Sequence, residues 1–143
     1  MDSKFDECLR KKYLVRIPVD KKLVEKELDG AKYDLTRAGN SLGEKDYKWC
    51  IIQSYYSMLH AVKAAVYSKG YREKSHYCLL VAFKSLFVDG NVIEEKYARF
   101  FEESMNLREE ADYGLIYSKE AAEDTVENAK KLLEKARSIL EAV

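Results

Sequence analysis

Proline and glycine are scarce in this chain, whose 143 residues include one proline and six glycines. An all-β fold needs many tight turns, and tight turns depend on these two residues, so the composition argues against it. Apolar residues make up 47% of the chain and charged residues 35%, which is typical of a folded globular protein. We therefore expect an all-α fold without a sheet, an up-and-down bundle of about five helices with a short extra N-terminal helix.

Long hydrophobic runs are also missing. Polar side chains interrupt the most apolar stretch, residues 49–67, so we expect no membrane span. The first fourteen residues are charged throughout and lack the apolar core of a signal peptide. These features favour a cytoplasmic protein.

Cysteine and histidine are few. Cys8, Cys50 and Cys78 are odd in number and form no C-x-x-C pair, so we expect neither a disulfide framework nor a zinc knuckle. His60 and His76 are far apart, and His76 with Cys78 offers too few ligands for a tetrahedral metal site. The chain has no glycine-rich phosphate loop either. We therefore expect no metal and no cofactor.

Six helices are expected from apolar spacing and capping residues. The first ends before Ile17-Pro18, because the residue before proline avoids helical geometry, and Asp20 and Ser75 can cap later helices. The expected helices span about residues 3–13, 20–42, 46–69, 76–88, 92–112 and 118–142. Apolar residues recur at spacings of three and four at Val24, Leu28, Ala31, Leu35, Ala38 and Leu42, and again at Ala122, Val126, Ala129, Leu133, Ala136, Leu140 and Val143. We expect one domain, 1–143, with an N-terminal extension, 1–19, and a bundle, 20–142.

The helix expected at 46–69 is apolar over most of its circumference, which is typical of a helix surrounded by others. It has one polar stripe, because Gln53, Ser57 and His60 share a face. Buried polar side chains need hydrogen-bond partners, so this face is either a cleft or an interface. His60 is accordingly either a satisfied core residue or a catalytic group.

Charge is unevenly distributed although the net charge is zero. Residues 49–85 hold five basic and one acidic side chains, whereas residues 86–143 hold eight basic and fourteen acidic ones. The basic middle is either an ordinary solvated surface or a surface that meets an anion. Within it, basic residues and tyrosines precede a helix N-terminus, a combination that suits phosphate and bases. The candidate ligand-binding residues of this loop are Lys69, Arg72, Lys74, Ser75 and His76.

The stretch 107–114, LREEADYG, puts Arg108 and Asp112 on one helical face, where opposite charges attract. Gly114 follows them as the residue that most readily ends a helix. A helix end with an ion pair explains the pattern, and a functional site around the arginine is the alternative.

Three segments stand out together: SYYSMLHAVKAAVYSKGYREKSH (54–76), LFVDG (86–90) and LREEADYG (107–114). They resemble the HEPN domain family, a helical nucleotide-binding domain of prokaryotes and higher eukaryotes, and the resemblance spans about residues 20–142. It implies a bundle of about five helices, commonly a homodimer, often encoded beside a minimal nucleotidyltransferase in toxin–antitoxin-like pairs. Many members resemble metal-independent ribonucleases. Their motif is an arginine followed, after four to six residues, by a histidine, and the two side chains together surround a phosphate at the dimer cleft.

Carried over to this sequence, the family's motif arginine is Arg108. Tyr113 stands where the shortest motif has its histidine, and no histidine follows His76. A phenol with a pKa of about 10 is a poor general base at neutral pH, so an imidazole would have to come from another helix or a second protomer. The candidate catalytic residues are thus Arg108, Tyr113 and His60, and Ser57 and Asp112 join the loop residues as candidate ligand-binding residues.

The leading hypothesis is a homodimer that binds a nucleotide or RNA and acts with a minimal nucleotidyltransferase partner. One alternative is a ribonuclease toxin with a non-standard catalytic set, and another is a purely structural dimerisation module. A homodimer is also expected because the polar-striped third helix and the aromatic fifth helix, with Tyr97, Phe100 and Phe101, offer more specific surface than one bundle needs.

Overall fold

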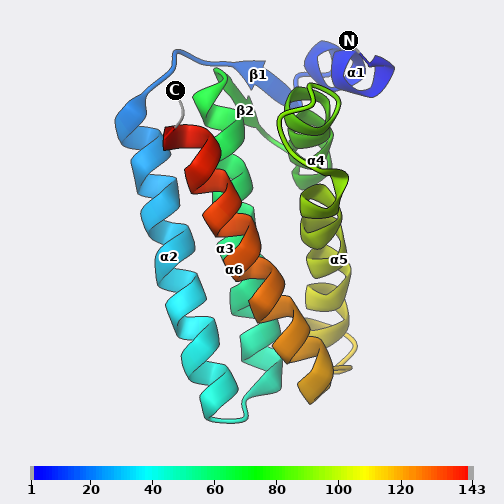
Figure 1. Ribbon diagram of the computed structural model, residues 1–143. Helices are drawn as coiled ribbons and strands as arrows, with labels where there is room; N and C mark the ends of the chain where they lie inside the picture. The colour runs from blue at the N-terminus through cyan, green and yellow to red at the C-terminus, as the bar shows by residue number, and fades with distance from the viewer. Residues whose placement is uncertain (1, 142–143) are drawn as a thin grey trace.

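The chain folds as a helical bundle in a computed structural model that describes residues 2–141. The elements in order are α1 (Ser3–Arg10), β1 (Leu14–Arg16), α2 (Lys21–Gly43), α3 (Tyr47–Ser68), β2 (Tyr71–Glu73), α4 (His76–Phe83), the π-helix η1 (Lys84–Val88), α5 (Glu95–Asp112) and α6 (Lys119–Glu141). The four long helices run alternately up and down (Figure 1). The all-α up-and-down bundle expected from the sequence is confirmed.

The long helices begin and end close to the expected positions because local signals define them. The Asp20 carboxylate accepts a hydrogen bond from the backbone N–H of Lys22 at 2.9 Å, and the Ser75 hydroxyl accepts one from that of Cys78 at 3.2 Å. Both are therefore N-caps, as expected. The expected helix 76–88 is continuous, but its last five residues adopt π-helical geometry. Val143, the last position of the expected stripe on α6, and residue 142, the expected end of the bundle, lie outside the described residues.

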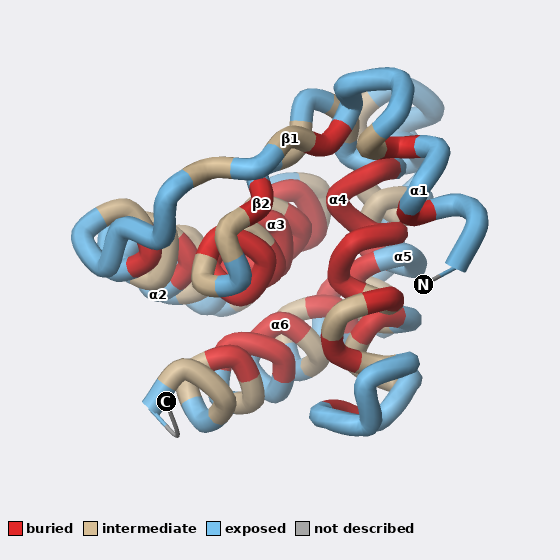
Figure 2. Tube along the Cα trace, turned by 90° about the horizontal axis from the view of Figure 1, so that it is seen from above, coloured by how far each residue is buried: buried red, intermediate tan, exposed pale blue. Residues whose placement is uncertain are grey.

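The helix at the centre of the bundle is α3. Most of its side chains are buried, on all sides of the helix, and the tube in Figure 2 shows the buried residues of the surrounding helices turned toward it. Small residues of α2, Ala31 and Ala38, are completely buried, which lets the two helices approach closely. Phe101 of α5 is likewise buried in the core, and Tyr97 and Phe100 pack partly against it.

A two-stranded sheet joins the N-terminal extension to the α3–α4 connection, so the expectation of a bundle without any sheet is wrong. Strands β1 and β2 pair antiparallel, with Leu14 opposite Glu73 and Arg16 opposite Tyr71. Strands of three residues are too short for an alternating pattern to reveal them. Three of the eight residues of the expected basic loop, 69–76, are therefore held in a strand.

A disulfide forms between Cys8 of α1 and Cys78 of α4, so the expectation of no disulfide is also wrong. The Cα atoms of the two residues are 5.8 Å apart although 70 positions separate them. Cysteine pairing depends on proximity in the folded chain, which spacing and an odd count do not reveal. The bond attaches the N-terminal extension to the first turn of α4, and Cys50 is left as a buried free thiol.

Among residues 2–141, no helix has both the length and the apolar character that crossing a membrane requires.

Candidate functional site

Arg108 lies on α5 and is surrounded by three tyrosine rings. Its guanidinium carbon is 5.7 Å from the ring centroid of Tyr55, 5.9 Å from that of Tyr56 and 5.3 Å from that of Tyr113. These distances are within the range of cation–π attraction. Two of the tyrosines come from α3 and one from the end of α5, so the packing of α5 on α3 builds the cluster. We call these four residues, with Asp112, the Arg108 cluster.

The polar contacts of Arg108 are few and long. One terminal nitrogen lies 3.4 Å from the Tyr56 hydroxyl and 3.5 Å from an Asp112 carboxylate oxygen, so the expected ion pair is present. The Nε atom is buried and has no hydrogen-bond partner among residues 2–141, although the side chain as a whole is 24% exposed. Such a guanidinium keeps unused hydrogen-bonding capacity, because five N–H donors are available in its planar fork.

Burial and charge act in opposite directions on the titrating groups of this cluster. Burial by itself would lower the pKa of Arg108, but the neighbouring hydroxyls of Tyr56 and Tyr113 and the Asp112 carboxylate outweigh it and raise that pKa. Burial raises the pKa of Tyr55 to about 12, although the charge of Arg108 opposes this shift. The cluster therefore holds a permanent cation beside a tyrosine that keeps its proton.

His76 joins the Arg108 cluster through Tyr55. The Tyr55 hydroxyl lies 3.0 Å from His76 Nδ1, and when the protonated hydroxyl donates, Nδ1 accepts and a neutral ring carries its proton on Nε2. His76 is exposed at the first turn of α4. The basic loop and the LREEADYG stretch, which thirty residues separate in the sequence, thus meet at one tyrosine.

The other candidate residues of the basic loop contact residues outside the Arg108 cluster. Lys69 lies over the Phe87 ring at 5.9 Å and Arg72 over the Tyr67 ring at 5.6 Å, while the backbone N–H of Lys74 donates to the carbonyl of Tyr13. Ser75 caps α4. Within residues 2–141, hydrogen bonds and ring contacts connect only His76 of this loop to the Arg108 cluster.

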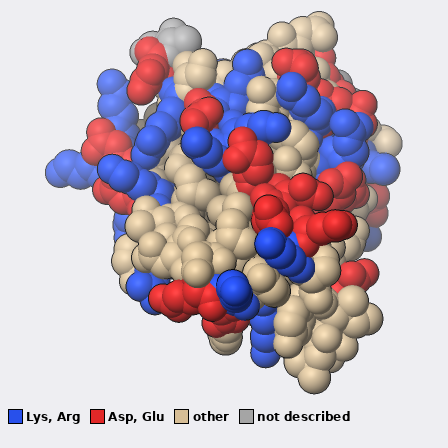
Figure 3. Space-filling view, turned by 60° about the horizontal axis from the view of Figure 1, so that its bottom comes forward, with Lys and Arg blue, Asp and Glu red and all other residues tan. Residues whose placement is uncertain are grey.

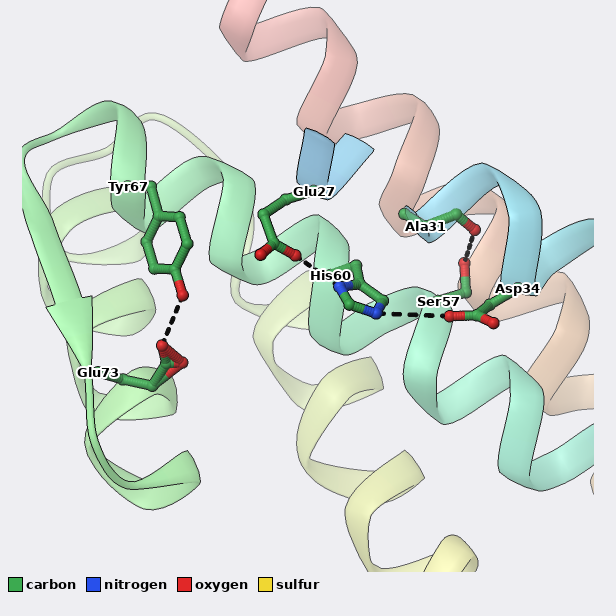
Figure 4. A network of polar contacts seen from close by, with 7 residues as sticks. All are labelled: Glu27, Ala31, Asp34, Ser57, His60, Tyr67 and Glu73. Carbon is green, nitrogen blue, oxygen red and sulfur yellow. Dashed lines mark hydrogen bonds and ion pairs between the residues drawn. The ribbon is translucent and has the colours of Figure 1, made fainter. Parts of the chain in front are cut away.

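The polar stripe of α3 faces α2 (Figure 4). The Ser57 hydroxyl donates to the Ala31 carbonyl at 2.8 Å, and Gln53 is hydrogen-bonded to Ser41 across the same interface. His60 Nδ1 lies 2.5 Å from Glu27, and its Nε2 lies 3.5 Å from Asp34. Both ring nitrogens are therefore engaged by α2. Of the two interpretations of His60, the geometry favours the satisfied interface residue over the catalytic group.

The carboxylates beside His60 respond to burial differently. Burial would raise the pKa of Glu27, but the hydrogen bond with His60 and the charge of Lys63 outweigh it, so this pKa is lowered. Burial also raises the pKa of Asp34, and the charge of His60 offsets only part of the effect. Glu27 is thus the stronger partner of His60. The same close-up shows Tyr67 donating to Glu73, which fastens β2 to α3 (Figure 4).

Sequence reasoning named Arg108, Asp112, Tyr113 and His76 but missed two residues that complete the cluster. Tyr55 and Tyr56 are adjacent in the segment SYYSMLH. An aromatic pair on an otherwise apolar helix resembles ordinary core, so only the pairing of α5 with α3 reveals its role. In the described part of the chain, no three side chains among His, Cys, Asp and Glu are close enough to hold a metal ion together.

Two glycines of α2 test how firmly His60 is held. A Cβ added at Gly30 would lie 3.3 Å from the His60 ring, whereas a Cβ added at Gly39 would contact nothing within 4 Å. We expect Gly39→Ala to raise the free energy of unfolding by about 0.5–1 kcal/mol, because alanine restricts the unfolded chain. Gly30→Ala should instead leave the free energy of unfolding unchanged or lower it, because the new Cβ crowds the His60 ring. Both values are measured by urea denaturation. Equal stabilisation in the two variants would mean that the ring moves aside freely.

Comparison with known proteins gives consistent matches. The HEPN domain profile matches residues 24–143. The chain is 29% identical over 114 residues to a Methanocaldococcus jannaschii protein named "Putative toxin MJ0605", covering 79% of this chain and 85% of that protein. It is 28% identical over 122 residues to "Putative toxin MJ0142" of the same organism, covering 84% and 83%. The crystal structure of TT1696 from Thermus thermophilus shares the fold, with a TM-score of 0.64 and 21% identity over 80% of this chain and 96% of that chain. Because the family profile spans most of the sequence, this protein belongs to the HEPN domain family.

Proposed function

We propose that this HEPN protein is a toxin-like protein that binds a nucleotide or RNA at the Arg108 cluster. The observation that carries the proposal is an arginine whose side chain is partly exposed and which, among residues 2–141, makes long polar contacts and has a buried Nε without a hydrogen-bond partner. Arginine presents two parallel donors that match the oxygens of a phosphate. The names of the two archaeal relatives support a toxin-like role.

The surroundings of Arg108 suit the base of a nucleotide as well as its phosphate. Tyr113 is 73% exposed and its ring adjoins the guanidinium, so one of its faces is available for stacking. Aromatic side chains stack on unpaired bases with little sequence preference. Asp112, by pairing with Arg108, fixes the direction of the guanidinium. Phosphate contact and base stacking therefore come from adjacent residues.

A second candidate function, ribonuclease activity, is favoured by the contact between His76 and Tyr55. This hydrogen bond links an imidazole to the arginine cluster from another helix, which compensates for the absence of a histidine after Arg108. An imidazole can act as a general base or acid near neutral pH. RNA cleavage that is lost in both Arg108→Ala and His76→Ala would raise this candidate above simple binding.

A homodimer is part of the proposal, but its support differs from what the sequence indicated. Phe101 and the polar stripe of α3 are used inside the bundle. Four apolar side chains of the α5–α6 connection are instead exposed, and Trp49 at the start of α3 is exposed as well. These four are Tyr113, Leu115, Ile116 and Tyr117. Apolar surface that continues from the candidate site suits a second copy of the chain.

A minimal nucleotidyltransferase remains the proposed partner of the protein, with support from the family resemblance and from the relatives named as toxins. A cytoplasmic location is likewise proposed. The Cys8–Cys78 bond is compatible with this location if it forms and breaks with the redox state of the cell, since cytoplasmic disulfides in most organisms are transient. A purely structural module would dimerise without binding any nucleotide or RNA.

Substitution of Arg108 tests the binding proposal. We expect Arg108→Ala to weaken binding of a fluorescent single-stranded oligoribonucleotide by about tenfold or more, because hydrogen bonds to charged groups contribute about 1.5–3 kcal/mol. Arg108→Lys should fail as well, since a point charge does not reproduce two parallel contacts. The matched control is Arg99→Ala, which removes another α5 arginine from an i,i+4 pair with Glu103. Equal binding by the Arg108 and Arg99 variants, all shown to be folded by melting, would refute the proposed site.

Sedimentation tests the homodimer. The wild-type protein should sediment as a dimer at about tens of micromolar, within the ordinary range of protein affinities. Ile116→Lys should shift it to monomer, because a lysine placed in an apolar contact loses its hydration. Val92→Lys, at another exposed apolar residue, is the control and should leave the dimer intact. A wild-type protein that is monomeric throughout this range would contradict the dimer.

A further inference from the structure

A cavity of about 290 Å³ lies between the N-terminal extension and the start of α4. Its lining includes both residues of the disulfide, Cys8 and Cys78. Each cysteine is only 3% exposed, so the bond is shielded by protein on most sides. The cavity provides a route by which a small reagent reaches it.

The charge around this cavity favours an anionic reagent. Lys4 and Lys11 line it, and Glu7 pairs with Lys11 at 2.8 Å. The first turn of α4 closes another side and adds the partial positive charge of a helix N-terminus. Two cations therefore face one carboxylate, and such an imbalance raises the local concentration of anions.

We propose that Cys8–Cys78 is a redox-active disulfide, reduced by a small anionic thiol that enters this cavity, and that its reduction releases α1 from α4. The inference stands on the disulfide, the cavity beside it and the lysines at its edge. It does not depend on the function proposed for Arg108.

The thiol–disulfide exchange proceeds in two steps. The thiolate of the reagent attacks Sγ of Cys8, a mixed disulfide forms there, and Cys78 leaves as a thiolate that then takes a proton from water. A second reagent thiolate attacks the reagent sulfur of the mixed disulfide, and Cys8 leaves as a thiolate that also takes a proton from water. Two reagent thiols are thereby oxidised to one disulfide. Cys78 is the favoured leaving group because it lies in the first turn of α4, where the helix stabilises a thiolate.

The structural consequence follows from how α1 is attached. Its only buried side chains are Phe5 and Cys8, and Phe5 packs edge-on against Tyr71 of β2 with ring centroids 5.3 Å apart. Once the covalent bond is broken, the apolar side chains that anchor this helix of eight residues are Phe5 and the partly buried Leu9, beside the reduced Cys8. Helices this short are marginal without tertiary contacts. The four long helices pack on one another through contacts that do not involve α1.

The state of the cysteines is measured first, on protein equilibrated with oxidised glutathione, then unfolded and alkylated without reductant. We expect one alkylated cysteine, Cys50, and three after reduction, read by intact mass. Three alkylated cysteines in the unreduced protein would overturn the proposal. During partial reduction, peptide mapping should find glutathione on Cys8 and not on Cys78, and the opposite pattern would refute the order of attack.

The cavity's role is measured by the rate of reduction with two thiols of opposite charge. Glutathione carries two carboxylates, whereas cysteamine carries an ammonium group. The Lys4→Glu, Lys11→Glu double variant should slow reduction by glutathione about fivefold and accelerate reduction by cysteamine. Lys32→Glu with Lys130→Glu, exposed lysines of α2 and α6, is the control and should change neither rate. Equal effects of the two double variants would contradict entry through the cavity.

Release of α1 is measured by hydrogen exchange on the oxidised and reduced wild-type protein. Amides of residues 3–10 should exchange faster after reduction, while those of α3 stay protected. Unchanged exchange in α1 would show that reduction releases nothing. The Cys8→Ser variant should match the reduced protein whether or not reductant is present.

Discussion

The burial of most of α3 by its neighbours is the constraint on which the rest of the molecule depends. A helix that is apolar around most of its circumference must be covered on most of its sides, and α2, α5 and α6 do this. Each of these three helices contacts a different part of α3. The stripe with Ser57 and His60 meets α2, the Tyr55–Tyr56 pair meets α5, and Cys50 meets the carbonyl of Ala122 in α6 at 3.7 Å. The positions of the Arg108 cluster and of the polar contacts of Ser57 and His60 follow from this one packing arrangement.

The two polar clusters along α3 differ in a way that separates structure from function. His60 has a carboxylate at each ring nitrogen, and a glycine of α2 lies against its ring. In the described part of the chain, Arg108 has three aromatic neighbours, two long polar contacts and one nitrogen without a partner. Side chains whose polar atoms have hydrogen-bond partners inside the protein contribute to the fold. A side chain with an unused hydrogen-bond donor beside exposed aromatic surface is suited to bind a ligand. Figure 3 shows Lys, Arg, Asp and Glu side chains interspersed over the face it presents, with uncharged surface between them. The candidate site is identified by this local geometry around Arg108.

Helices could be predicted from the sequence because their signals are local. The local signals are the caps Asp20 and Ser75, the i,i+4 pair of Arg108 with Asp112, and the spacing of apolar residues by three and four in α2. That spacing is seen at Val24, Leu28, Ala31, Leu35 and Ala38. Features that depend on the tertiary arrangement could not be predicted. The Cys8–Cys78 bond spans 70 positions. The β1–β2 pairing joins two three-residue strands, of which one precedes α2 and the other follows α3 in the sequence. The link from His76 through Tyr55 to Arg108 likewise exists only after α4 and α5 have packed on α3.

The most direct test of the binding account observes the Arg108 side chain itself. Its Nε is buried, so the attached hydrogen should exchange slowly with water and give a resolved NMR signal in protein labelled with nitrogen-15. On titration with a short single-stranded oligoribonucleotide, the account predicts that this signal shifts together with those of the Tyr55, Tyr56 and Tyr113 rings. An Arg108 signal that stays unchanged while signals at Lys69 and Arg72 shift would mean that RNA binds elsewhere and would contradict the account.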